Sequence, residues 1–101
     1  MLKIRLLGVP LIELDGELLS INRRAPRALL FYLAMHKEPI GRDQLCDFIW
    51  AGEGGEQDQK RKLRGVLNNL RKSFSSRDVI RTYHDMVGLV QYDLYVDAWQ
   101  F

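Results

Sequence analysis

The chain has 101 residues, enough for one domain with a modest core, and a formal net charge of only +2. Hydrophobic residues make up 47% and charged residues 28%, as in ordinary globular proteins. The single cysteine, Cys46, excludes an intramolecular disulfide framework and fits a reducing compartment. No apolar run approaches the ~18 residues of a membrane span, and the charged start does not fit a signal peptide. We therefore expect a soluble, cytoplasmic domain that makes no membrane contact.

The first 21 residues have the patterns of short strands. Apolar and basic residues alternate over positions 2–6, as in a half-buried strand. Residues 11–14 predict a second strand, and Asp15-Gly16 predicts a tight hairpin turn because glycine tolerates positive φ. Residues 17–21 complete a third strand. We expect these strands to form a small antiparallel sheet.

A first helix is predicted over residues 27–36, where apolar residues occupy nearly the whole circumference. Such a helix lies at the centre of a fold and packs on several sides. Pro26 is expected at its first position, where the missing N–H is not needed. Arg24 lies just before it, in a cluster with Arg23 and Arg27. This cluster either meets phosphates at the positive end of the helix or is simply solvated.

A second helix is predicted to begin near Arg42 and to extend to Trp50. Arg42 at its start is a candidate phosphate contact. Cys46 has no partner for nucleophilic chemistry, so we interpret it as a small packing residue. The inward face of this helix is predicted to contain Leu45, Phe48 and Ile49.

The most informative stretch is residues 59–74, where apolar residues follow the i, i+3, i+4, i+7, i+11 spacing of one helix face. Seven of the 15 basic residues fall in residues 59–77, which contain no Asp or Glu. The remaining chain has eight basic and 13 acidic residues, so positive charge is concentrated here. A third helix (about 58–75), anchored on one face and cationic on the other, suits DNA recognition better than an ordinary solvated role. The residues of its anchoring face are Leu63, Val66, Leu67, Leu70 and Phe74.

Residue types on the outward face of this helix predict different roles in DNA binding. Arg61, Arg64 and Asn68 point the same way, and Gly65 between them allows close backbone approach. Because arginine pairs bidentately with guanine and asparagine with adenine, these three are the predicted base-reading residues. Other cations suit phosphates, which position a protein without specifying a sequence. The predicted backbone contacts are Arg24, Arg42, Lys60, Lys62, Arg71 and Lys72.

A hairpin is predicted directly after the basic helix, from strands at 78–82 and 86–91 around a turn at 83–85. Arg81 and His84, on or near its tip, are candidate contacts to DNA. When a basic helix ends a three-helix unit and a hairpin follows, the helix enters the major groove and the hairpin reaches a neighbouring groove or phosphates. The order of elements therefore predicts an α+β winged helix-turn-helix domain. Its parts are an N-terminal antiparallel sheet (1–21), a three-helix core (23–77), a wing hairpin (78–92) and the start of a linker (93–101).

The sequence also resembles a known family. The stretches that carry the resemblance are LKIRLLG, RAPRALLFYLAMHKE, PIGRDQLCDFIW, KLRGVLNNLRKSF and VDAWQF, in this order along nearly the whole chain. Together they resemble the OmpR/PhoB-type winged-helix domain, and more closely the N-terminal domain of SARP-type (AfsR/EmbR-like) bacterial transcriptional activators. The resemblance implies binding to double-stranded promoter DNA, often as two copies on direct repeats, and activation through contact with RNA polymerase.

Two features of the resemblance bear on mechanism. The hairpin, RTYHDMVGLVQ, lacks the Gly-Gly-Tyr or Gly-x-Gly-Tyr turn that is usual in the family. Family members continue into a helical bacterial transcriptional activation domain (BTAD), whose opening the chain approaches with Asp97 and Phe101. The resemblance therefore implies that a signal-responding or oligomerising domain follows.

The same sequence features also bear on three alternative functions: protein interaction, RNA binding and catalysis. A winged-helix protein-interaction module would dock its basic helix on an acidic partner, but charge alone would not need the amides of Asn68 and Asn69. RNA binding would call for an exposed aromatic strand surface, which is not evident. The sequence has no cofactor fingerprint, metal-ligand cluster or nucleophile with a base, and His36 and His84 fall in unrelated elements. We expect no enzymatic activity, cofactor or metal.

Overall fold

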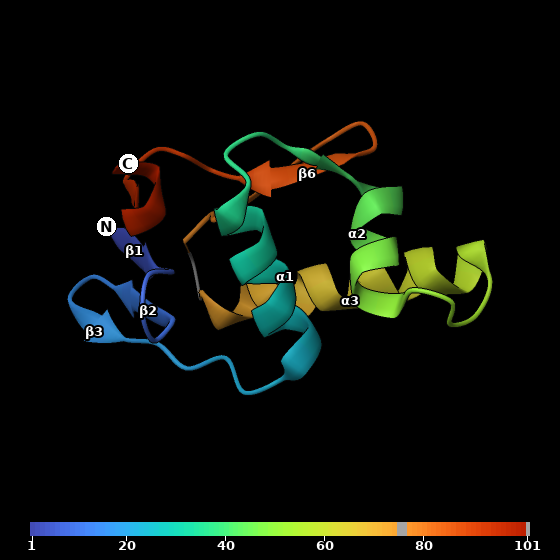
Figure 1. Ribbon diagram of the computed structural model, residues 1–101, viewed down its shortest axis with the longest axis horizontal. Helices are drawn as coiled ribbons and strands as arrows, with labels where there is room; N and C mark the ends of the chain where they lie inside the picture. Colours follow the sequence, from blue (N-terminus) through green and yellow to red (C-terminus); the bar gives the residue numbers. More distant parts are fainter. Residues whose placement is uncertain (75–76, 101) are drawn as a thin grey trace.

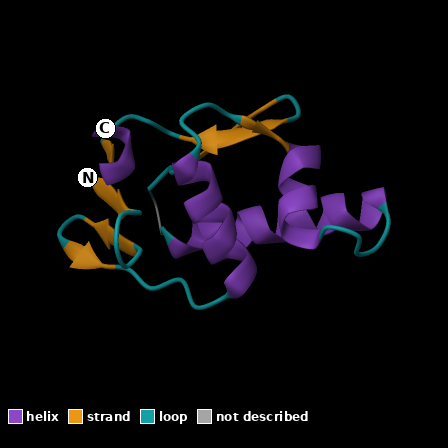
Figure 2. Cartoon of the chain, viewed as in Figure 1, coloured by secondary structure: helices purple, strands orange, loops and turns teal. Residues whose placement is uncertain are grey.

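The computed structural model describes residues 1–74 and 77–100 (Figure 1). Over this part of the chain the architecture is mixed α+β, with three α-helices, one 3-10 helix and two sheets (Figure 2). Ser75, Ser76 and Phe101 lie outside the described residues. The predicted end of the third helix at residue 75 and the family-type Phe101 therefore fall outside them too.

A four-stranded sheet occupies one end of the molecule, with the strand order β3-β2-β1-β7 (Figure 1). The predicted hairpin turn is confirmed: Leu14 pairs with Glu17, and Asp15 and Gly16 between them have φ of 52° and 88°. The strand after the turn is shorter than predicted and ends at Leu18. The strands are β1 (Leu2–Arg5), β2 (Leu11–Leu14), β3 (Glu17–Leu18) and β7 (Leu94–Val96).

The three predicted N-terminal strands pair antiparallel, as expected, but strand β7 was not predicted and adds to their sheet in parallel. This strand pairs in parallel with β1, with Leu2 opposite Leu94 and Ile4 opposite Val96. Val96 is 1% exposed and belongs to the core. The segment that was expected to start a linker is therefore a structural strand. Its pairing joins two segments far apart in the sequence, which local patterns do not reveal.

After β7 the chain forms a 3-10 helix, η1 (Asp97–Gln100), that is fastened to both β1 and the first helix. The backbone N–H groups of Leu6 and Leu7 donate to the Asp97 carboxylate at 2.7 and 3.2 Å. The Trp99 indole N–H donates to the carbonyl of Ala34 at 2.8 Å. These bonds hold the segment against the domain.

Helix α1 (Arg24–Met35) crosses the centre of the molecule and packs against α2, α3 and strand β6 (Figure 1). The expectation of Pro26 at the first helical position was wrong, because the helix begins at Arg24 and Ala25 is also helical. Pro26 is the third helical residue. It sacrifices no hydrogen bond there, since the first four N–H groups of a helix have no intrahelical partner.

Helix α2 (Arg42–Trp50) follows directly from the short strand β4 (Ile40–Gly41). The prediction that Phe48 lies on its inward face was wrong. Phe48 is 49% exposed and stacks on Tyr32 of α1 with ring centroids 4.0 Å apart, whereas Cys46 is 3% exposed. The buried stripe is rotated toward Cys46 because α3 packs on that side of α2.

Helix α3 (Glu56–Ser73) confirms the predicted amphipathic helix. All five residues of the anchoring face are at most 8% exposed, and the last of them, Phe74, is the C-cap of the helix. The helix begins earlier than predicted, so Glu56 and Asp58 lie in its first turn, where acidic groups favour the positive helix end.

A second sheet has the order β4-β6-β5 and contains the predicted hairpin. Strands β5 (Ile80–Tyr83) and β6 (Met86–Leu89) join through a two-residue turn, with Tyr83 paired with Met86. His84 in this turn has φ of 53°. Tyr83 is therefore a strand residue and not part of the turn.

Both sheets and all three α-helices contribute to one hydrophobic core. No helix in residues 1–74 or 77–100 has both the length and the apolarity of a bilayer span.

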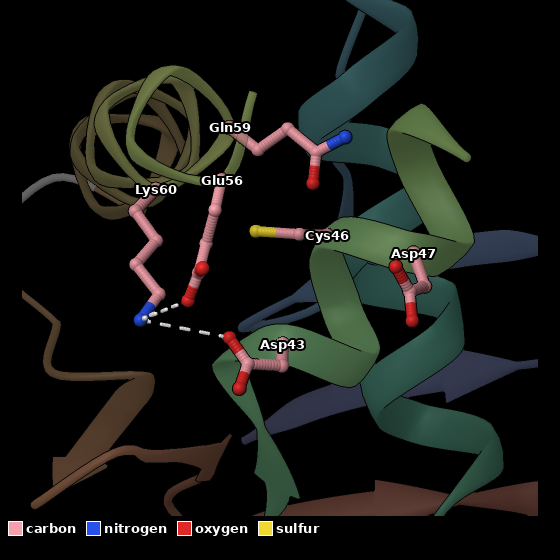
Figure 3. Close-up of a pocket in the computed structure, with 6 residues that line it drawn as sticks. All are labelled: Asp43, Cys46, Asp47, Glu56, Gln59 and Lys60. Atoms are coloured by element: carbon pink, nitrogen blue, oxygen red, sulfur yellow. Dashed lines mark ion pairs between the residues drawn. The ribbon is translucent and has the colours of Figure 1, made fainter. Parts of the chain in front are cut away.

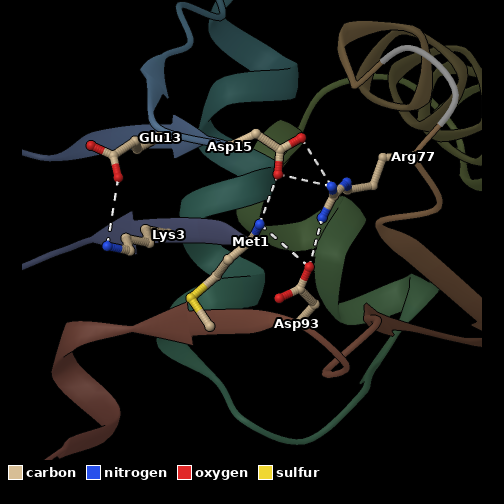
Figure 4. A network of polar contacts seen from close by, with 6 residues as sticks. All are labelled: Met1, Lys3, Glu13, Asp15, Arg77 and Asp93. Atoms are coloured by element: carbon tan, nitrogen blue, oxygen red, sulfur yellow. Dashed lines mark hydrogen bonds and ion pairs between the residues drawn. The ribbon is translucent and has the colours of Figure 1, made fainter.

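The segment after α3 is tied to the N-terminal sheet by charge (Figure 4). Arg77 donates to both oxygens of Asp15 at 2.8 and 2.9 Å and to Asp93 at 3.0 Å. The ammonium group of Met1 lies 2.7 Å from Asp15 and 3.3 Å from Asp93. Two cations and two carboxylates thus fix the end of α3 relative to strands β1, β2 and β7.

Candidate nucleic-acid interface

The outward face of α3 consists of residues that core packing leaves in solvent. Arg61, Arg64 and Asn68 are exposed together on the side opposite the anchoring face. Gly65 lies among them, and a Cβ built on it would have no heavy atom within 4 Å. The backbone of α3 is therefore open to close approach at the middle of its cationic face. Lys72 is exposed on the same face, two turns further along.

A groove lies where α3 meets the start of α2 and strand β5. It collects four predicted DNA contacts from two helices, and three of them are arginines. Guanidinium groups bind phosphates and base edges in a bidentate manner, so their convergence makes an anion-binding surface. The residues that line the groove are Arg42, Arg64, Leu67, Asn68, Arg71 and Thr82.

Hydrogen bonds fix the walls of this groove relative to one another. Strand β4 pairs with β6, with Gly41 opposite Met86, and continues without a break into α2. The backbone N–H of Arg42 donates to the carbonyl of Asp85 at 2.9 Å. The start of α2, where helix N–H groups favour anions, is therefore held beside the hairpin turn.

Thr82 is a groove residue that the sequence prediction missed. It shares one side of β5 with the buried Ile80, because strand side chains alternate. This alternation was readable in the sequence and would have separated Thr82 from Arg81. Arg81 lies on the other side of the strand, and His84 lies in the turn with its ring 4.4 Å from that of Tyr83. Both predicted hairpin contacts are exposed, and neither lines the groove.

Lys60, one of the predicted phosphate contacts, is engaged with acidic residues. Its Nζ lies 3.4 Å from Glu56 of the same helix and 3.6 Å from Asp43 of α2 (Figure 3). The hydrogen bond to Glu56, with the charge of Asp43, raises the pKa of Lys60 above its usual value. Lys60 therefore stays charged but is not a free cation in this arrangement.

Arg61 and Lys62 share a single carboxylate. The Arg61 guanidinium donates to Oδ1 of Asp58, and Nζ of Lys62 lies 3.4 Å from Oδ2. These two hydrogen bonds hold the pKa of Asp58 below its usual value. Three predicted DNA contacts in the first turns of α3 are thus paired within the protein, whereas the groove arginines have no ion pair with any residue of 1–74 or 77–100.

Cys46 faces a hollow between α2 and α3 (Figure 3). Burial raises the pKa of its thiol, and Asp43 and Asp47 add to the effect. The thiol is therefore protonated at neutral pH, which fits a packing role. On the same side, Gln59 donates to the carbonyls of Trp50 and Glu53 at 3.0 and 2.6 Å, fastening the loop before α3.

Arg24 is the predicted DNA contact that the structure separates from the rest. It is exposed at the start of α1 and lines a different hollow with Phe48, Ile49 and Trp50. None of the groove residues takes part in that hollow.

Within the part of the chain that the structure describes, no group of three or more His, Cys, Asp or Glu side chains is arranged so that it could hold a metal ion. Comparison of the chain with protein-family models, curated proteins and solved structures finds no match.

Proposed function

We propose that this chain is a winged helix-turn-helix domain that binds double-stranded DNA sequence-specifically and regulates transcription. The observation that carries the proposal is the groove that joins Arg42, Arg64, Asn68 and Arg71 beside strand β5. Helix α3 would enter the major groove, which is ~12 Å wide and admits an α-helix. The β5–β6 hairpin would act as the wing and reach the neighbouring groove or phosphates.

Base reading is assigned to the middle of α3. Arg64 and Asn68 combine the right chemistry for guanine and adenine with an exposed position in the groove. Arg61 remains a third candidate, because a bidentate contact to guanine is stronger than an exposed ion pair with Asp58. Phosphate contacts are assigned to the other cations: Arg24, Arg42, Lys60, Lys62, Arg71 and Lys72, with Arg81 and His84 on the wing.

The resemblance to OmpR/PhoB-type and SARP-type regulators supports the same function and suggests its setting. Promoter DNA, contact with RNA polymerase and pairing of two copies on direct repeats are proposed on that ground. A bacterial cytoplasmic location belongs to the same proposal.

The test begins by selecting bound duplexes from a random pool and then measures binding of variants to the selected sequence. Arg64→Ala and Asn68→Ala should each weaken binding by ~1–3 kcal/mol and relax the preference at one base position. Arg71→Ala should weaken binding to all sequences and reduce the magnitude of the salt slope by about 1.

A matched control is Arg5→Ala, which removes an exposed arginine from strand β1 and should leave sequence preference unchanged. If Arg64→Ala and Asn68→Ala alter neither affinity nor preference, the proposed docking is wrong. If the protein binds no duplex at low salt, the alternative of a protein-interaction module is favoured.

A further inference from the structure

The cations of α3 fall into two groups with different surroundings. In the first turns, Lys60, Arg61 and Lys62 each lie within ion-pair distance of a carboxylate. Further along the helix, the cations have no ion pair with any residue of 1–74 or 77–100, and they include two of the groove arginines. These later cations are Arg64, Arg71 and Lys72. The positive face of α3 is thus neutralised at its start and open from its middle onward.

Asp58 is placed to hold two of the paired cations at once. It is the third residue of α3, so Arg61 and Lys62 follow at the i+3 and i+4 spacings that bring side chains together. Each oxygen of its carboxylate serves one cation. Gly54 in the preceding loop leaves room for this arrangement, since a Cβ there would lie 3.0 Å from Oδ2 of Asp58.

We infer that Asp58 is an intramolecular competitor of DNA: it holds Arg61 and Lys62 in ion pairs that contacts to DNA must replace, and it thereby limits the affinity of the domain for duplex DNA. The inference rests on the proposed DNA-binding function. The physical basis is the relative strength of the three contacts that a cation can make: with Asp58, with a DNA phosphate or with guanine. The equilibrium between the formed and the broken state of an exposed ion pair favours the formed state by roughly 1.4- to 5-fold. A single cation gains a comparable factor from contact with one DNA phosphate. A bidentate arginine–guanine contact discriminates by roughly 5- to 150-fold.

The competition therefore affects binding to both kinds of DNA. On random duplex, Arg61 and Lys62 gain little by leaving Asp58, so they contribute little affinity. On a site with guanine in reach, Arg61 leaves Asp58 because the bidentate contact is stronger. Because breaking the ion pair subtracts its full strength from the guanine contact, Asp58 lowers affinity for both duplexes and lowers it at least as much for the selected site as for random sequence.

The test compares Asp58→Asn with the wild-type chain on random and selected duplexes over a series of salt concentrations. Loss of both ion pairs should tighten binding to random duplex by roughly 2- to 30-fold. The salt dependence should steepen by ~0.9 for each new phosphate contact, up to about 2. Affinity for the selected duplex should rise by at least as large a factor, because Arg61 no longer has to break an ion pair to reach guanine.

Glu56→Gln is the matched control, because it removes the same charge from the same turn. Lys60 then still has Asp43 at 3.6 Å, so we expect the salt slope of this variant to stay at the wild-type value. Arg61→Ala combined with Asp58→Asn gives a double-mutant cycle and should remove a large part of the gain. Thermal unfolding of each variant checks that α3 remains folded.

The outcomes separate the two proposals. If the wild-type chain binds duplex DNA but Asp58→Asn and Glu56→Gln behave alike, the role of Asp58 is refuted and the proposed function stands. If neither the wild-type chain nor Asp58→Asn binds any duplex at low salt, the proposed function itself is refuted.

Discussion

Asp97 joins two segments of the chain through a single carboxylate. It accepts the N–H of Leu6 at 2.7 Å and that of Leu7 at 3.2 Å, just after strand β1. The bond from Leu6 is the main reason that the pKa of Asp97 is lowered from its ordinary value of 3.8. A carboxyl group with a lowered pKa stabilises the folded state while it is ionised, and this contribution is lost as pH falls through the folded-state pKa.

Asp97→Asn should therefore be less stable than the wild type at pH 7, because the amide is a weaker acceptor than the carboxylate. The difference in the free energy of unfolding should have its full size above the unfolded-state pKa near 3.8 and should shrink as pH falls further. Urea midpoints measured from pH 7 down to about pH 2.5 would show this. Glu17→Gln, an exposed carboxylate change on β3, is the control. A difference that stays constant with pH would contradict the assignment.

At the residue scale, the sequence indicated the types of contact residue better than their partners. Arg64 and Asn68 lie exposed in one groove, as their helical spacing predicted. The pairing of Arg61 with Asp58 was also readable from i, i+3 spacing, because the predicted helix (about 58–75) already contained both residues. The side of β5 on which Thr82 lies was readable from strand alternation, but its place beside Arg64 and Arg71 in the groove depends on tertiary packing.

At the scale of elements, α3 carries a conflict between stability and proposed function. Glycine in a helix interior costs about 1 kcal/mol relative to alanine, and a Cβ at Gly65 would meet nothing within 4 Å. Gly65→Ala should therefore stabilise the fold by ~1 kcal/mol in urea unfolding. The same change should weaken DNA binding if the backbone of α3 approaches the bases there.

Gly54→Ala is the matched comparison for this prediction. Gly54 has φ of +69°, a conformation that costs an L-residue ~1–2 kcal/mol, and its Cβ would press on Asp58. We expect this alanine to destabilise the fold, in the opposite direction to Gly65→Ala. Equal effects of both substitutions would show that helix propensity does not govern Gly65.

Elements with a local cause were predictable, and those with a distant partner were not. The anchoring face of α3 and the Asp15-Gly16 hairpin follow from periodicity and turn chemistry, and both are confirmed. The buried stripe of α2 is rotated from its predicted position, which exposes Phe48, and this rotation depends on where α3 packs. Strand β7 depends on a pairing with β1 that no local pattern encodes.

At the scale of the whole molecule, the segment after residue 91 is expected to be essential for stability. Removal of residues 92–101 would delete Val96, which is 1% exposed, and the Trp99 bond to Ala34. We expect a loss of at least ~3–5 kcal/mol in the free energy of unfolding, from lost apolar burial together with the lost hydrogen bonds of Asp97 and Trp99. Tyr92→Ala, at a residue 89% exposed, should change stability by no more than ~0.5 kcal/mol. An unchanged urea midpoint after truncation would mean that the segment acts only as a linker.

The parallel pairing of β1 with β7 also governs how the domain folds. Leu6 and Asp97, whose hydrogen bond lies just beyond this strand pair, are 91 positions apart, so a loop of nearly the whole chain must close before they meet. Contacts at such separation slow folding, whereas the backbone hydrogen bonds of α3 and of the two hairpins are local, so we expect these elements to form earlier. We therefore expect substitutions in β7 to accelerate unfolding far more than they slow folding.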